Sequence, residues 1–198
     1  LTHPHADHLT GLLEVVRRYR VRQVLLPQAD YDSPLYREWL SLIREKNIGA
    51  TLAEAGQQIN LGGGALIEVL NAPASSRNSD TDNDGVVLRL VAGTVSVLLT
   101  ADIEQATEGE LLSQRAISAS TILKVAHHGS NTSTSSEFLA VTDPQAAVIS
   151  SGTGNRFGHP SPEVVKRLEQ QSGVYRTDQQ GTIEFTTDGE RLWVKTER

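Results

Sequence analysis

The feature that most constrains this chain is a cluster of metal-capable side chains at its start. The first eight residues, LTHPHADH, contain three of the six histidines in the chain and an aspartate. Side chains alternate along an extended backbone, so His3 and His5 are expected to point to the same side. Asp7 and His8 follow where the chain enters a predicted helix, and they can reach a second point nearby. Two imidazoles can bind one cation, and a carboxylate and an imidazole can bind a second cation beside it. The cluster therefore predicts a two-metal hydrolytic site.

Composition limits what this site can be. The 198-residue chain has no cysteine, so only nitrogen and oxygen atoms can bind a metal. Its net charge of −6 argues against wholesale electrostatic capture of nucleic acid, although a local basic groove is compatible with it. We find no apolar run of the roughly 20 residues that a membrane helix needs, and no signal peptide. Leu1 and Thr2 resemble the end of a strand, so we expect residues 1–198 to form one domain that is N-terminally truncated.

Hydrophobic periodicity predicts helices and strands that alternate early and give way to a β-rich second half. Helices are expected over residues 9–19, 33–46, 161–168 and in short segments after residues 103 and 135. Strands are expected over residues 21–26, 50–53, 58–61, 65–70, 86–91, 94–100, 121–126, 146–150, 174–177, 182–185 and 191–195. Residues 74–84 are expected to form a polar loop. The pattern predicts a layered α/β protein with mixed sheets and outer helices.

The remaining candidate site residues follow predicted strands, where α/β folds usually build their sites. Asp102 ends an apolar strand, so it is expected to be buried and to bridge two cations; an N-cap for a helix starting at Ile103 is the alternative. We expect His128 to bind the metal, and His127 to contact either the substrate or the metal ligands. The alternative is that His127 binds the metal and His128 takes the other role. His159 lies near Asn155 and Arg156, whose donors suit a phosphate, and is either a further ligand or a proton donor and phosphate contact.

Together these motifs resemble the metallo-β-lactamase superfamily. The His-x-His-x-Asp-His pattern at His3 to His8 and the aspartate at Asp102 match its metal-binding motifs. The runs LLTADIE, LKVAHHGS, VISSGTGNRFGHPSPEVVKRL and YRTDQQGTI are similar to the C-terminal hydrolase domain of ComEC-type DNA-internalisation proteins. The phosphorylcholine-esterase branch of the superfamily shares the Asp-x-Glu and His-His-Gly elements.

The resemblance implies an αββα sandwich that binds two divalent ions, zinc or manganese, between its sheet edges. It implies six metal ligands: His3, His5, Asp7, His8, Asp102 and His128. It places Glu104, His127 and His159 behind the ligands or facing a phosphate. The residues expected to take part in catalysis are Asp7, His127 and His159.

Three features depart from the family pattern. The superfamily usually supplies another histidine near residue 71, where this chain has Asn71; the amide oxygen or a water could take its place. The usual glycine before the bridging aspartate is Ala101. The N-terminal β-hairpin that normally precedes the first motif, with another aspartate near the metals, is missing, so one sheet is expected to lack strands.

The function that the resemblance implies is hydrolysis of a phosphodiester in DNA during DNA uptake. A hydroxide held between two metals would attack phosphorus, and His127 or His159 would assist the leaving oxygen. The alternatives are another metallo-hydrolase (phosphorylcholine esterase, lactonase or thioesterase) and a non-catalytic domain that binds metal or DNA. The expected partners are DNA or another phosphodiester and a covalently linked membrane channel domain. The domain itself is expected to be a soluble part of a bacterial membrane protein, while the side of the membrane and the oligomeric state stay open.

Overall fold

The computed structural model describes residues 1–28, 31–72 and 82–198. Its helices are α1 (Ala6–Arg18), α2 (Pro34–Glu45), α3 (Gln105–Ser113), the 3₁₀ turn η1 (Ala126–Gly129), α4 (Ser136–Thr142), α5 (Pro162–Glu169) and α6 (Thr177–Gln180). Its strands are β1 (Gln23–Leu26), β2 (Gly49–Leu52), β3 (Gln58–Gly62), β4 (Ala65–Asn71), β5 (Val87–Ala92), β6 (Val95–Leu99), β7 (Ile122–Lys124), β8 (Ala146–Ile149), β9 (Gly173–Arg176), β10 (Ile183–Thr187) and β11 (Leu192–Thr196).

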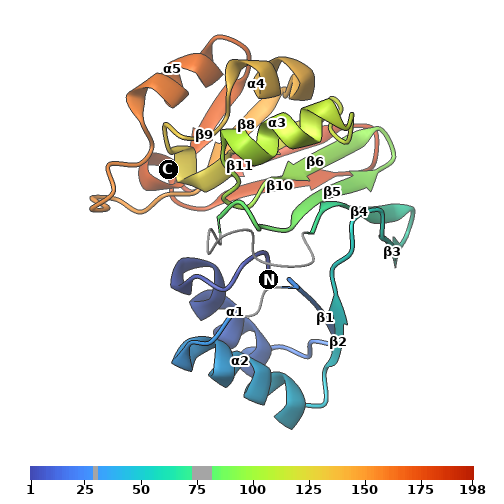
Figure 1. Ribbon diagram of the computed structural model, residues 1–198. Coiled ribbons are helices and arrows are strands. Elements are labelled where there is room, and N and C mark those ends of the chain that lie inside the picture. The colour runs from blue at the N-terminus through green and yellow to red at the C-terminus, as the bar shows by residue number, and fades with distance from the viewer. Residues whose placement is uncertain (29–30, 73–81) are drawn as a thin grey trace.

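Seven of these strands form one mixed sheet. Their order follows the chain from β3 to β9: β3 to β6 run antiparallel to their neighbours, and β6 to β9 run parallel. β1 and β2 form a separate parallel pair, and β10 and β11 form an antiparallel hairpin. Figure 1 shows the large sheet with α3, α4 and α5 in one half of the molecule, and the β1–β2 pair with α1 and α2 in the other.

Three apolar clusters show that these elements are stacked in four layers. The first lies between the large sheet and helices α3 to α5, and includes Leu98, Leu123 and Phe138. A second joins α1 and α2 to the small sheet. The third lies between the two sheets, where Leu25 of β1 packs with residues of β4 and β5 such as Val69. Helix, sheet, sheet and helix therefore follow one another, which confirms the predicted αββα architecture.

Helix α2 illustrates how the sequence specifies its elements. Ser33 is the N-cap, and its hydroxyl accepts a hydrogen bond from the Tyr36 N–H at 3.1 Å, while Pro34 occupies the first turn. Trp39 of α2 is buried in the apolar cluster that joins α1 and α2 to the small sheet. Among the described residues, no helix has both the length and the apolar character to cross a membrane.

The structure corrects three details of the prediction. Leu1 and Thr2 are not part of a strand, although Leu1 N donates to Leu25 O at 3.0 Å and Thr2 O accepts from Val86 N at 3.1 Å. The strand expected over residues 121–126 is shorter, because the chain turns into η1 before the two histidines. The short helix α6 falls where the end of a strand was expected. Residues 74–81 of the predicted polar loop lie outside the described residues.

Candidate metal centre

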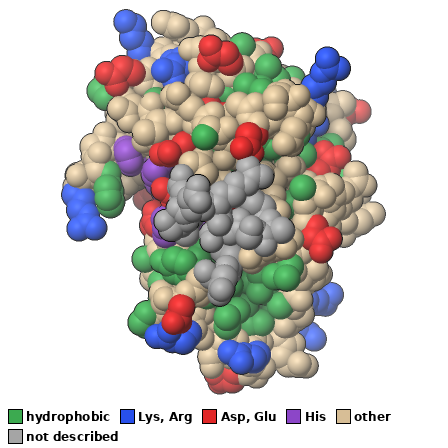
Figure 2. Space-filling model, viewed as in Figure 1, with side chains coloured by type: hydrophobic (Ala, Val, Ile, Leu, Met, Phe, Trp, Pro, Cys, Tyr) green, Lys and Arg blue, Asp and Glu red, His purple; other side chains and the backbone are tan. Residues whose placement is uncertain are grey.

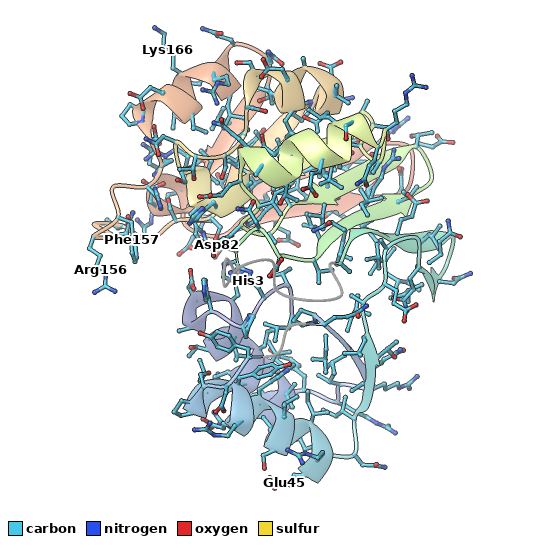
Figure 3. The ribbon with its side chains drawn as sticks, viewed as in Figure 1. His3, Glu45, Asp82, Arg156, Phe157 and Lys166 are labelled. Atoms are coloured by element: carbon cyan, nitrogen blue, oxygen red, sulfur yellow. The ribbon has the colours of Figure 1, made fainter. Side chains whose placement is uncertain are left out.

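The candidate ligands meet where the two halves of the molecule join. His3 and His5 precede α1, and Asp7 and His8 lie in its first turn. Asp102 follows β6, and His128 lies in the η1 turn after β7. Figure 2 shows histidine and acidic side chains gathered at this junction, and Figure 3 shows His3 and Asp82 there.

The first group of ligand atoms comes from Asp7, His8, Asp102 and His128. His8 Nε2 lies 3.0 Å from Asp102 Oδ2, 3.3 Å from His128 Nε2 and 3.7 Å from Asp7 Oδ2. His128 Nε2 lies 3.1 Å from Asp7 Oδ2 and 3.2 Å from Asp102 Oδ2. Ligands bound at about 2.0–2.1 Å around a tetrahedral ion lie about 3.4 Å from one another. The four atoms therefore have the spacing of a metal-binding set.

The second group consists of His3, His5 and Asp82. Asp82 Oδ1 lies 3.1 Å from His5 Nδ1 and 3.8 Å from His3 Nε2. His3 Nε2 also lies 3.9 Å from Asp102 Oδ2, the oxygen that contacts the first group. Asp102 therefore stands between the two groups, which is where a bridging carboxylate would stand.

Asp82 is the candidate ligand that the sequence reasoning missed. The search for site residues followed the ends of strands, whereas Asp82 precedes β5. Since β5 runs antiparallel to β6, the start of β5 lies at the same sheet edge as the end of β6, where Asp102 follows. The acidic run DTDND at residues 80–84, just before an apolar strand, is the signal that could have identified it.

Burial and hydrogen bonds shift the pKa values of the site residues. Burial lowers the pKa of His3 to about 3, with help from the nearby His8, so this imidazole is neutral as a metal ligand must be. Burial alone would raise the pKa of Asp102, but hydrogen bonds with His128 and His8 outweigh it and hold that pKa well below the usual range. The hydrogen bond with Asp102 raises the pKa of His128 in turn. The lowered pKa of Asp102 and the raised pKa of His128 both favour an ion pair between the carboxylate and the imidazolium.

Two buried polar atoms support a metal at this place. Within the described parts of the chain, His3 Nε2 and Asp102 Oδ1 are buried and lack a hydrogen-bond partner. A buried polar atom without a partner is costly, and a bound cation removes that cost for an imidazole nitrogen or a carboxylate oxygen. The donor set of nitrogen and oxygen atoms fits a divalent ion such as zinc or manganese.

The two adjacent histidines are separated by an unusual backbone. His127 and His128 both have positive φ, 47° and 54°, a conformation that costs free energy in residues other than glycine. It turns His128 toward the first group, where its Nδ1 bonds to Ser150 O at 2.7 Å. His127 faces the other way, with its Nδ1 3.4 Å from Glu104 Oε1 and its Nε2 3.9 Å from Asp82.

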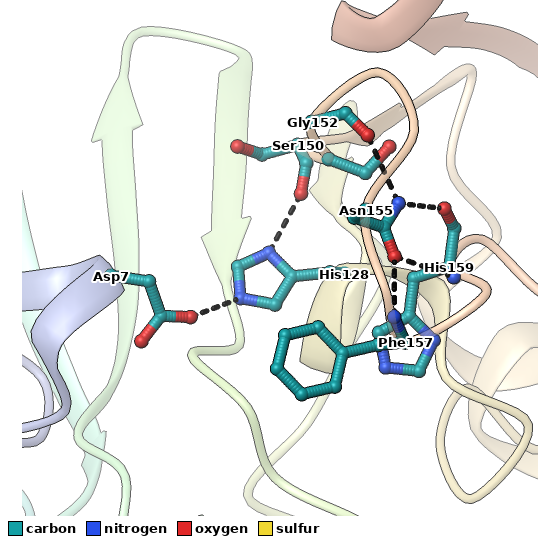
Figure 4. Close-up of a pocket in the computed structure, with 8 residues that line it drawn as sticks. Asp7, His128, Ser150, Gly152, Asn155, Phe157 and His159 are labelled. Carbon is teal, nitrogen blue, oxygen red and sulfur yellow. Dashed lines mark hydrogen bonds and ion pairs between the residues drawn. The ribbon is translucent and has the colours of Figure 1, made fainter.

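A pocket of about 390 Å³ opens beside the first group (Figure 4). Asp7, His128, Phe157 and His159 line it, and burial lowers the pKa of His159. The ring of His159 lies 5.7 Å from that of His127, centroid to centroid, so the two imidazoles expected to face the substrate are neighbours.

Two of the open alternatives receive a structural answer. Asp102 is not an N-cap, because α3 begins at Gln105 with Glu104 in the cap position. Asn155 does not present its amide as a phosphate donor: its Nδ2 donates to Gly152 O and His159 O. Asn71 Nδ2 donates to Gly85 O at 2.9 Å.

The fold and this centre define a class of protein. The family model of the metallo-β-lactamase superfamily matches residues 1–153, and the chain belongs to that superfamily. It is a hydrolase-like domain with His and Asp groups that can hold divalent metal ions.

Three relatives, one of them named a competence protein, are similar to the chain. It is 31% identical over 186 residues to ComE operon protein 3 of Bacillus subtilis (strain 168), a match that covers 93% of this chain. It is 36% identical over 115 residues, 57% of this chain, to Competence protein ComA of Neisseria gonorrhoeae. Recombination protein 2 of Haemophilus influenzae is 28% identical over 199 residues and matches all of the chain. The chain spans 24%, 17% and 23% of the lengths of these relatives.

Proposed function

We propose that this domain hydrolyses phosphodiester bonds in DNA with the help of two divalent metal ions, zinc or manganese, as part of a DNA-uptake protein. The observation that carries the proposal is the pair of ligand groups, which Asp102 Oδ2 links, together with the 390 Å³ pocket that Asp7 and His128 of the first group line. Bound metals would supply an activated water and neutralise negative charge on the phosphate.

The chain's own residues divide the remaining work. Asp7, His8 and His128 would hold one cation, His3, His5 and Asp82 the other, and Asp102 would touch both. Ser150 O fixes the orientation of His128 by accepting from its Nδ1, which leaves Nε2 for the metal. A Glu104 carboxylate oxygen lies 3.4 Å from His127 Nδ1, and the Thr132 hydroxyl donates a hydrogen bond to that carboxylate at 2.6 Å.

His127 and His159 would interact with the substrate. Because the pKa of His159 is lowered, its imidazole is mostly neutral at pH 7. A neutral imidazole can donate an N–H hydrogen bond to a phosphate oxygen, and its imidazolium form can give a proton to the departing oxygen and return to the neutral form. The choice of DNA as substrate, and the larger protein with its membrane channel, rest on the similarity to these relatives and on the resemblance to ComEC-type proteins described above.

The test is hydrolysis of single-stranded and duplex oligonucleotides by protein loaded with Mn²⁺ or Zn²⁺. We expect strand cleavage that chelation abolishes and that Asp102→Asn reduces by at least about 100-fold, the usual effect of removing electrostatic stabilisation from an active site. Asp32→Asn is the matched control: its side chain is 81% exposed and pairs with Arg37.

Metal content has to be measured alongside activity. Protein that carries two ions per chain and cleaves no oligonucleotide would refute the nuclease assignment. Hydrolysis of esters or lactones by the same preparation would instead identify another metallo-hydrolase. Retention of full activity by Asp102→Asn would place the chemistry at a different site.

A further inference from the structure

Phe157 is an exposed aromatic side chain at the edge of the candidate centre. It is 67% exposed, and it lines the same pocket as Asp7 and His128. A single exposed apolar residue normally needs no explanation. Phe157 differs because two residues that line the same pocket, Asp7 and His128, are candidate metal ligands, so a substrate held at the metals lies within reach of its ring. Figure 4 shows the ring of Phe157 facing the space next to His128.

The loop that carries Phe157 is held in place before any substrate binds. Asn155 Oδ1 accepts from the backbone N–H groups of Phe157, at 3.2 Å, and His159, at 3.0 Å. Asn155 Nδ2 donates to Gly152 O at 3.0 Å and to His159 O at 2.6 Å. The Phe157 ring also stacks on that of His159, with 6.0 Å between centroids and 15° between planes. An aromatic ring fixed in this way loses little conformational entropy when a ligand packs against it.

The neighbouring charge indicates what kind of ligand fits. The guanidinium of Arg156 lies over the Phe157 ring, 5.1 Å from its centroid, and Figure 3 shows both side chains at the tip of the same loop. This cation favours a phosphate and repels a quaternary ammonium group such as choline. A flat apolar ring next to an arginine is the combination with which proteins bind single-stranded nucleic acid: bases stack on the ring while the backbone phosphates meet the positive charge.

We propose that Phe157 is a stacking platform for an unpaired base of the substrate next to the scissile phosphate, with Arg156 contacting an adjacent phosphate. This inference rests on the proposed function. It makes single-stranded DNA, or the unpaired end of a duplex, the preferred substrate, because a base must leave its helical stack to lie on the ring.

The test combines two substrates with three variants. The first substrate is a single-stranded oligonucleotide with 2-aminopurine at the base next to the cleaved bond, and the second carries an abasic site there. Stacking quenches 2-aminopurine fluorescence, so binding can be measured with the metal-free protein as well as the metal-loaded protein. Phe157→Ala removes the ring, Phe157→Trp keeps a stacking surface, and Tyr19→Ala removes an aromatic side chain of similar exposure, 70%, at the far end of α1.

Stacking of one base corresponds to about a 5- to 150-fold change in affinity. We therefore expect Phe157→Ala to raise Kd and KM for the base-containing strand by about 10-fold and to leave those for the abasic strand nearly unchanged. Phe157→Trp should bind and quench like the parent, and Tyr19→Ala should change neither constant. An equal effect of Phe157→Ala on both strands, or none on either, would overturn the platform. A protein that cleaves neither strand but still quenches 2-aminopurine through Phe157 would overturn the proposed nuclease function and leave the base-binding inference standing.

Discussion

The side chain of Ala101 occupies the space that a side chain at Gly85 would need: a Cβ at Gly85 would lie 2.9 Å from Ala101 Cβ and 3.1 Å from Asp82 O. Ala101 has a φ of 51°, the left-handed conformation that favours glycine. Where the superfamily usually has a glycine, this chain has an alanine. Gly85, on the segment that enters β5, leaves room for it.

This contact predicts that Gly85 and Ala101 are energetically coupled. Gly85→Ala should lower the free energy of unfolding by about 1–3 kcal/mol, the usual effect of overpacking. In the Ala101→Gly variant, Gly85→Ala should lower the free energy of unfolding by about 1 kcal/mol less, because the contact with Ala101 Cβ is absent. A double-mutant cycle by urea denaturation measures the difference. Strict additivity would show that the Cβ contact carries no energy.

The second prediction concerns Asp82 and the metal count. Asp82→Ala should remove one of two ions per chain, because it deprives His3 and His5 of their carboxylate partner. Elemental analysis of the purified variant checks this, and circular dichroism shows whether it is folded. Asn71→Ala is the informative comparison. If that variant loses the ion and Asp82→Ala keeps it, the amide at residue 71 is the ligand.

A third prediction concerns Glu108, a fully buried carboxyl group of α3 that anchors the loop after η1. Its oxygens accept the backbone N–H groups of Thr134 and Ser135. An amide in its place can accept only one of them, so Glu108→Gln should lower the free energy of unfolding by about 1–3 kcal/mol. Chemical denaturation at pH 7 measures the loss. A change below about 0.5 kcal/mol would mean that the loop finds other acceptors.

Glu108 should also make stability depend on pH. Burial raises its pKa above the ordinary 4.5, against the opposing effect of the Ser135 and Thr134 N–H groups. Because its folded-state pKa is raised, Glu108 contributes its full share of the free energy of unfolding at pH values below its unfolded-state pKa. That contribution declines as pH rises through the folded-state pKa. The advantage of the parent over Glu108→Gln should therefore shrink as pH rises from about 4. A constant difference between the two proteins would contradict the raised pKa.

The fourth prediction concerns the loop of residues 152–160. Asn155→Ala removes the four hydrogen bonds that the Asn155 side chain makes within this loop. Amide hydrogen exchange should become faster in this loop, while exchange in β8 and α5 should stay near that of the parent. Mass spectrometry of peptic fragments resolves the two regions. If amide exchange became faster by the same factor in the loop, β8 and α5, the loop would open only together with the rest of the protein.

The sequence was most informative where the structure is local. The spacing of His3, His5, Asp7 and His8 predicts two ligand pairs, and the described structure separates the same four residues into two groups. The periodicity of the sequence predicts a layered α/β protein, and the αββα order of its layers is what the family resemblance implies. The assignment of ligand roles to these residues stays a prediction, which metal analysis of the variants addresses.

Non-local features could not be obtained in this way. Asp82 reaches the site because β5 pairs antiparallel with β6, a pairing that spacing does not reveal. The positive φ of His127 and His128 is imposed by the surrounding fold and has no local signal such as a glycine. Burial of Glu108 depends on a loop 26 residues away in sequence.

The two residues before His3 join the small sheet to the large one, since Leu1 bonds to β1 and Thr2 bonds to Val86. His3 and His5 are thereby tied to both layers at once. Sliding of one layer over the other would change the distance between the two candidate ligand groups, so the same backbone bonds that join the layers also help to set that distance. The loop that carries Phe157 makes neither of these bonds, so a substitution in it can reshape the pocket while the two groups keep their spacing.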